Sequence, residues 1–156
     1  MQKDYIIRML EQFVQAILAI TCRREAGECK EARSQVQTVA RDLLRIDIDL
    51  LLLFDNDHVL DHFRDFANRL DTEKCVLGAD LFLELAFIEE AEHRMAIAER
   101  LKILCLYLYT TALPKEPQFQ KPEYFAKVAT LIKELKDQSL SGEVQLYREW
   151  FKNLRK

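Results

Sequence analysis

The chain contains very few of the residues that interrupt helices. Only 3 glycines and 3 prolines occur among its 156 residues. Proteins built from strands use glycine and proline in frequent turns, whereas long helices need few turns, so this scarcity predicts an all-α protein. A chain of this length can bury a core without disulfide or metal support. We therefore expect residues 1–156 to form a single helical domain.

Apolar residues recur every three or four positions along most of the sequence, which is the pattern of amphipathic helices. Gly27, Gly142 and the proline-rich stretch 114–122 interrupt this pattern and mark expected turns. The pattern predicts about seven helices, paired as antiparallel hairpins, over residues 2–25, 28–45, 57–70, 71–93, 95–113, 122–138 and 141–156. Residues 47–54 contain an apolar run too short to show a period.

The expected helix over 71–93 is apolar almost all round, so we expect it to be the central, buried helix. Asp71 is its expected N-cap. Pro122 suits the first turn of a later helix, and Ser141 is the expected cap of the last one. On the central helix only a narrow acidic stripe interrupts the apolar surface, formed by Glu73, Asp80 and Glu84.

Residues 82–110 resemble a tetratricopeptide repeat, a unit of two antiparallel helices that stacks on neighbouring copies. Large and small residues match that pattern at Phe82, Leu85, Ala86, Ala98 and Cys105. A weaker resemblance surrounds Gly27, where Ile20 replaces an expected small residue. The resemblance implies a right-handed stack of helical hairpins. An unrelated helical bundle is the alternative.

The opening residues 4–12, DYIIRMLEQ, are similar to the start of a group of short bacterial proteins with tetratricopeptide-like helices. This resemblance implies a bacterial cytoplasmic protein and brings no assigned activity. The polar residues at the start do not suit a secretory signal. The longest uncharged apolar run, residues 103–113, is shorter than the roughly 20 residues of a membrane-crossing helix. We expect a cytoplasmic protein with no membrane segment.

Charge is distributed unevenly along the sequence. Residues 47–93 carry 13 acidic and 3 basic side chains. The basic surplus of residues 94–156 is spread out and forms no compact run, so nucleic acid is not an expected partner. The four cysteines form no CxxC pair, and we expect free, mostly buried thiols.

Asp80 and Glu84 lie one turn apart on the helix expected to be buried, and such like charges repel. One interpretation is an internal cation that neutralises them, with four candidates: Arg23, Arg24, Arg41 and Arg100. The other is a groove for a basic or polar peptide. In that case Asp80, Glu84 and first-helix residues such as Arg23 and Arg24 would bind the partner.

Three aromatic residues, Tyr147, Trp150 and Phe151, lie close to the C-terminus. They either cap the stack by packing on the preceding helix, or form an exposed seam between the subunits of a homodimer.

Histidines and carboxylates at helical spacing suggest an alternative metal site. His58 and His62 are one turn apart, and Glu90 and His93 form an ExxH spacing used in di-iron bundles, although the full set of ligands is incomplete. No glycine-rich phosphate loop or nucleophile motif occurs in the sequence. We therefore expect a non-catalytic adaptor or scaffold that binds a protein or peptide without a cofactor. The alternatives are a helical-bundle metalloprotein and a self-associating structural or regulatory protein.

Overall fold

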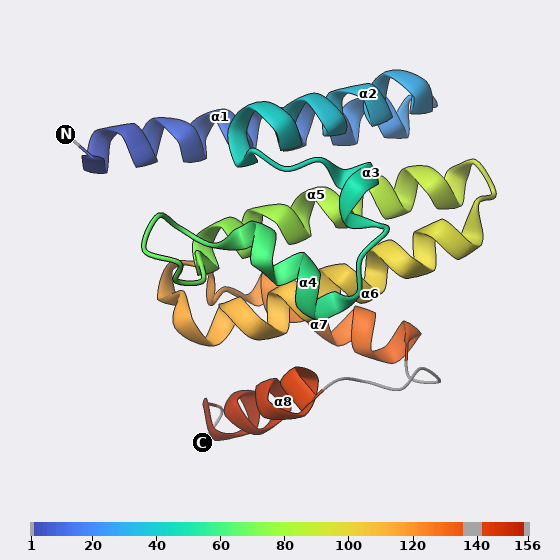
Figure 1. Cartoon of the computed structure of the whole chain (residues 1–156). Helices are drawn as coiled ribbons and strands as arrows, with labels where there is room; N and C mark the ends of the chain where they lie inside the picture. The colour runs from blue at the N-terminus through green and yellow to red at the C-terminus, as the bar shows by residue number, and fades with distance from the viewer. Residues whose placement is uncertain (1, 136–141, 155–156) are drawn as a thin grey trace.

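The computed structural model describes residues 2–135 and 142–154, and this part of the chain is built mainly from helices (Figure 1). The helices are α1 (Gln2–Glu25), α2 (Cys29–Val39), α3 (Ile48–Leu51), α4 (Asn56–Leu60), α5 (Thr72–Ala91), α6 (Met95–Ala112), α7 (Pro122–Glu134) and α8 (Gly142–Leu154). Among the described residues there is no strand, only one isolated bridge. The all-α prediction is confirmed.

Two antiparallel hairpins form the upper layers of the molecule as Figure 1 shows it. The α1–α2 hairpin lies on α5, which contacts both of its helices and pairs with α6. On the other side, α6 contacts both α7 and α8. One continuous cluster of buried apolar side chains runs from Phe13 in α1 to Tyr147 in α8. Whether the hairpins stack as tetratricopeptide repeats do stays a prediction.

Helix α5 is the central, buried helix, as its apolar circumference predicts. The Asp71 carboxylate accepts a hydrogen bond from the Lys74 backbone N–H at 3.0 Å, so Asp71 is the N-cap expected from the sequence. Nearly all side chains from Cys75 to Ile88 are buried. Because the helix has apolar neighbours on all sides, it carries almost no solvent-facing stripe.

A close contact fixes the long connection between the two hairpins against α5. A Cβ atom at Gly78 would lie only 2.5 Å from Cε1 of Phe63, whose side chain is fully buried. Since glycine has no side chain, the phenyl ring lies directly on the helix. This contact helps to hold residues 45–71, which include α3 and α4, over the α5–α6 hairpin, together with hydrogen bonds from Arg100 and Tyr107 in α6.

The helix expected over residues 28–45 changes character before it ends. The α-helical part, α2, ends at Val39, and the chain then makes one π-helical turn, Ala40–Leu44. Arg45 then adopts a left-handed conformation with φ 58°. Ala40 and Leu44 stay buried in the wider turn, so the apolar pattern on which the prediction rests is preserved.

The prediction of a helix over residues 57–70 is wrong beyond Phe63. After α4 the chain makes a 3-10 turn, Asp61–Phe63, and then a loop closed by a bridge between Arg64 and Leu70. The Asp65 carboxylate accepts hydrogen bonds from the backbone N–H groups of Ala67 and Arg69 at 2.9 and 3.0 Å. An aspartate that bonds nearby backbone in this way competes with helix formation.

The ends of the later helices follow the predicted signals in part. Pro122 occupies the first turn of α7, as expected. Helix α7 ends at Glu134, a few residues before the predicted end near 138. The predicted cap Ser141 lies outside the described residues.

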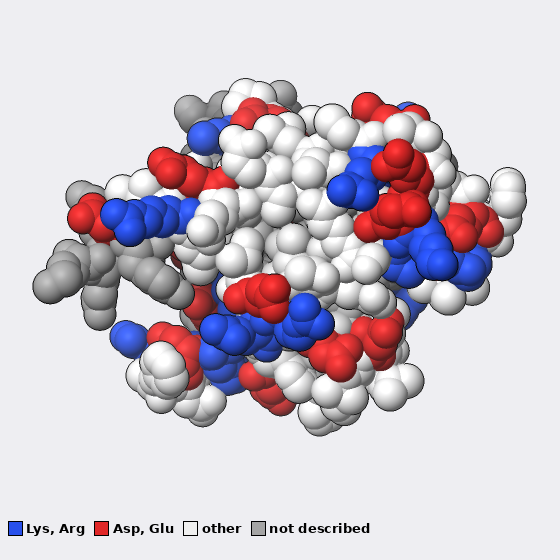
Figure 2. Space-filling view, turned by 90° about the horizontal axis from the view of Figure 1, so that it is seen from above, with Lys and Arg blue, Asp and Glu red and all other residues white. Residues whose placement is uncertain are grey.

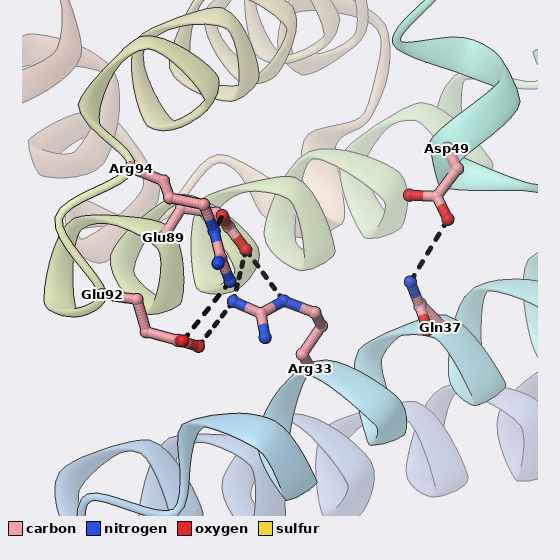
Figure 3. A network of polar contacts seen from close by, with 6 residues as sticks. All are labelled: Arg33, Gln37, Asp49, Glu89, Glu92 and Arg94. Carbon is pink, nitrogen blue, oxygen red and sulfur yellow. Dashed lines mark hydrogen bonds and ion pairs between the residues drawn. The ribbon is translucent and has the colours of Figure 1, made fainter.

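An ionic network joins α2 to the turn between α5 and α6 (Figure 3). Arg33 Nη2 lies 2.6 Å from Oε1 of both Glu89 and Glu92, and Arg94 Nε lies 2.6 Å from Glu89 Oε2. Glu89 is therefore held between two guanidinium groups from different elements. The network fastens the two hairpins to each other at this end of the molecule.

Candidate functional site

A groove of about 370 Å³ opens between α1, α5 and the start of α7. Most of its surface is apolar, and α1 supplies one complete wall. Its lining residues are Leu10, Phe13, Val14, Ile17, Leu18, Leu77, Asp80, Gln118, Phe119, Lys121, Tyr124 and Lys127. The groove therefore brings Asp80 together with apolar residues of α1. The other three residues that the sequence suggested for a binding wall, Glu84, Arg23 and Arg24, are not among its lining residues.

The outer edge of this groove is apolar and open to solvent. Val14 and Leu18 in α1 line the groove, lie one turn apart and are 55% and 54% exposed. Figure 2 looks down on the α1–α2 layer and shows an uncharged area across the middle of this face, with charged side chains gathered around it. Exposed apolar side chains beside a hollow are typical of binding surfaces.

The floor of the groove contains the buried carboxylate of Asp80, which is only 8% exposed. It accepts hydrogen bonds from the phenol hydroxyl groups of Tyr109 in α6 and of Tyr124 in α7, the latter at 2.9 Å. Lys127 Nζ lies 3.6 Å away. Asp80 thus joins three helices at one point.

Burial dominates the electrostatics of this floor. It raises the pKa of Asp80 above the usual carboxyl value, although Lys127 and the two phenols act in the opposite direction. Burial, together with the charge of Asp80, also raises the pKa of both Tyr109 and Tyr124. The two phenols therefore remain protonated donors at neutral pH.

Glu84, one turn further along α5, is also used within the chain. It accepts hydrogen bonds from the Thr21 hydroxyl at 2.9 Å and from Arg24 Nε at 3.0 Å. The Arg24 guanidinium group lies over the ring of Phe87, 5.0 Å from its centroid. Of the predicted internal cations, Arg24 is therefore the one that pairs with this stripe.

The other three arginines do not contact Asp80 or Glu84. Arg41 pairs with Asp42, and Arg100 donates to Asn56 at 2.7 Å. Arg23 is exposed and lines a separate shallow hollow between α1 and α2. Of the four alternatives for an internal cation, the structure thus selects Arg24, and the other three side chains lie near different parts of the molecule.

Sequence reasoning missed the residues that hold Asp80. Tyr109 lies in a strongly apolar helix and is indistinguishable there from a core aromatic. Lys127 gives a usable signal, because it is a basic residue between Tyr124 and Val128 on the inner face of α7. A cation on an inward face predicts a buried anion opposite to it.

The C-terminal aromatic residues pack against α7. Tyr147 is buried and stacks on Phe151 with ring centroids 5.9 Å apart. Phe125 in α7 contacts both Phe151, at 5.0 Å, and Trp150, at 6.3 Å. Within one chain, these three residues therefore pack on each other and against α7, as the first interpretation expects. The homodimer stays a proposal.

The residues of the alternative metal site have separate surroundings. His58 Nδ1 lies 2.7 Å from Asp55 Oδ1, and His62 stacks on Phe54 at 5.3 Å. Glu90 accepts from Lys102 at 3.0 Å, and His93 forms the left-handed turn between α5 and α6 with φ 63°. Within residues 2–135 and 142–154, no three His, Cys, Asp or Glu side chains converge as metal ligands would.

The two innermost thiols are poorly suited to nucleophilic chemistry. Burial raises the pKa of Cys75 to about 12 and that of Cys105 well above its usual range. Cys22 is exposed and Cys29 is half-buried, and all four cysteines are free.

No described helix combines the length and the apolar character needed to cross a bilayer. Comparisons of the chain with protein-family models, with curated proteins and with solved structures find no match.

Proposed function

We propose that this chain is a non-catalytic adaptor or scaffold that binds a segment of another protein in the groove between α1, α5 and α7. The observation that carries the proposal is the exposure of Val14 and Leu18 beside an apolar hollow. Leaving these side chains in water costs free energy that a bound partner recovers, at about 25 cal/mol per Å² of apolar surface. A tetratricopeptide-like stack acting in the cytoplasm fits this role.

The rigid surroundings of the groove support a binding role. Its floor is fixed by the bonds from Tyr109 and Tyr124 to Asp80, and its α1 wall is tied to α5 by Arg24 and Glu84. A groove that is already formed needs little rearrangement on binding, so less of the binding free energy is lost to ordering side chains.

Affinity capture from the native host, followed by mass spectrometry, tests this function. The double variant Val14→Asp, Leu18→Asp places two charges on the groove edge and leaves every buried residue unchanged. Leu146→Asp is the control, because Leu146 is an apolar residue in α8 that is also exposed, at 67%. We expect the wild type and the control to capture the same proteins and the double variant to lose them.

Circular dichroism must show the same helical signal for all three proteins. If the double variant is folded and still captures the same partners as the wild type, the groove is not the binding site and the proposal is wrong.

A further inference from the structure

We infer that the segment bound by the groove is an amphipathic helix that carries acidic residues along one edge of its apolar face. This inference rests on the proposed function and adds the chemistry of the partner. It follows from three properties of the groove: its carboxylates already have hydrogen-bond partners within the chain, accessible lysines lie at its edge, and its walls are helices.

The carboxylates near the groove are already bonded within the chain. Asp80 accepts from two phenol hydroxyl groups and lies near Lys127. Glu84 accepts from Thr21 and Arg24. A basic partner would have to compete with these donors for carboxylates that are largely shielded from solvent. The sequence suggested a basic or polar peptide because it could not show that both carboxylates have partners.

Among the residues that line the groove, the accessible charges belong to two lysines. Lys121 is exposed just before α7, and the structure gives it no ion pair with any described residue. The Lys127 side chain is 40% exposed, and its one described carboxylate partner is 3.6 Å away. An ammonium group has three donors, so Lys127 retains the capacity to bind a second carboxylate. The nearest acidic neighbour on α7, Glu123, lines a separate hollow on the other side of Lys127.

The walls of the groove favour a helix over an extended peptide. Helices α1, α5 and α7 use their backbone groups in their own hydrogen bonds, so they offer no edge with which a strand could pair. An extended peptide would bury unpaired backbone N–H and C=O groups against apolar side chains. A helix satisfies these groups internally and presents apolar residues at i, i+3, i+4 and i+7.

The occupant is therefore a helix with a narrow apolar face and with Asp or Glu on the side that meets α7. An anionic lipid surface would also be attracted to Lys121 and Lys127. The hollow is concave, however, and suits protruding side chains better than a flat bilayer.

Selection from a display library of helical peptides, with the apolar and flanking positions randomised, tests the inference on the full-length chain. We expect peptides that combine an apolar face with Asp or Glu on one edge to be enriched. The affinity of an enriched peptide is then measured by fluorescence anisotropy. Lys121→Glu should weaken it by about fivefold, because it replaces an exposed attraction with a repulsion. This variant should also lose part of the salt dependence.

Lys133→Glu is the matched control, since Lys133 is an exposed lysine on α7 that does not line the groove. It should change the affinity by less than about twofold.

Enrichment of basic or uncharged helices, or an affinity that Lys121→Glu leaves unchanged, would overturn the charge inference and leave the binding function intact. If no peptide prefers the wild type over the Val14→Asp, Leu18→Asp variant, both the inference and the proposed function fail. Binding to phosphatidylserine vesicles that Lys121→Glu abolishes would assign the surface to lipid, which also overturns the inference.

Discussion

Two carboxylates of α5, Asp80 and Glu89, are buried to almost the same degree, at 8% and 4% exposure, but different chemistry holds them. Glu89 lies between the guanidinium groups of Arg33 and Arg94, both at 2.6 Å. Asp80 has two neutral phenol donors and a lysine at 3.6 Å. The first arrangement joins two hairpins, and the second forms the floor of a groove.

The pKa shifts of these two groups have opposite signs. Burial alone would raise the pKa of Glu89, but the bonds from Arg94 and Arg33 more than offset it and lower the pKa. For Asp80 burial prevails, and the pKa is raised. The difference has two causes. Asp80 is surrounded by the side chains of three helices, so removal from water dominates its pKa, whereas Glu89 lies near the end of α5, where two close guanidinium groups outweigh a smaller cost of burial.

The largest expected effect follows from removing the better-paired carboxylate. Glu89→Ala leaves both arginines without their shared partner, and we expect a loss of about 2 kcal/mol in the free energy of unfolding. Glu92→Ala removes a more exposed contact of Arg33 and should cost less than about 1 kcal/mol. Urea denaturation of both variants at neutral pH measures the difference. Equal losses would contradict a special role for Glu89.

A comparison of pH profiles tests the opposite pKa shifts directly. The pKa of Asp80 is higher in the folded protein than in the unfolded chain. This shift contributes fully to the free energy of unfolding at pH values below the pKa of the unfolded chain, and the contribution is lost as the pH rises through the pKa of the folded protein. The pKa of Glu89 is lower in the folded protein than in the unfolded chain. Its contribution to the free energy of unfolding is present at pH values above the pKa of the unfolded chain and is lost as the pH falls through the pKa of the folded protein.

Between the pKa values of its unfolded and folded states, each carboxylate makes the wild type sensitive to pH. Relative to the wild type, Asp80→Asn should therefore become more stable as the pH increases, and Glu89→Gln should become more stable as the pH decreases. Each slope is limited to about 1.4 kcal/mol per pH unit for one proton. Denaturation by urea from pH 3 to 8 measures both slopes, and slopes of the same sign for the two variants would refute the comparison.

A smaller effect is expected from the phenol that fastens α7. Tyr124→Phe removes the donor to Asp80 and keeps the ring contacts to Tyr109 and Phe119. We expect a loss of about 1 kcal/mol. Tyr147→Phe, which removes a hydroxyl group for which no hydrogen bond is described, is the control and should change stability less. Denaturation experiments in which the control loses as much as Tyr124→Phe would show that the bond to Asp80 contributes little.

The smallest effect concerns the oligomeric state. Trp150 contacts Tyr147 and Phe125 within the same chain. We therefore expect Trp150→Asp to leave the mass measured by sedimentation equilibrium unchanged, provided that its helical signal is retained. A lower mass for the folded variant than for the wild type would support the homodimer through this face.

The sequence predicted the fold well where one strong local pattern decides it. The apolar circumference of α5, the Asp71 cap and Pro122 at the start of α7 all have their predicted places. The loop after Phe63 was missed because two backbone bonds to Asp65 outweigh the helical pattern there.

The candidate site was predictable only in part. The acidic stripe of the buried helix pointed to Asp80, which lines the groove beside α1, but the other suggested residues, Glu84, Arg23 and Arg24, do not line it. Its actual partners Tyr109, Tyr124 and Lys127 are brought to it by tertiary packing of α6 and α7. Neither spacing nor composition specifies such contacts between helices, so the sign of the accessible charge could not be predicted.

The contact between Gly78 and Phe63 limits how related chains can diverge. Any side chain at position 78 would occupy the space of the phenyl ring, with even a methyl carbon only 2.5 Å from it. A larger residue at 78 therefore requires a smaller one at 63 in the same chain. In homologues these two positions should vary together, and a substitution at one of them alone should be selected against.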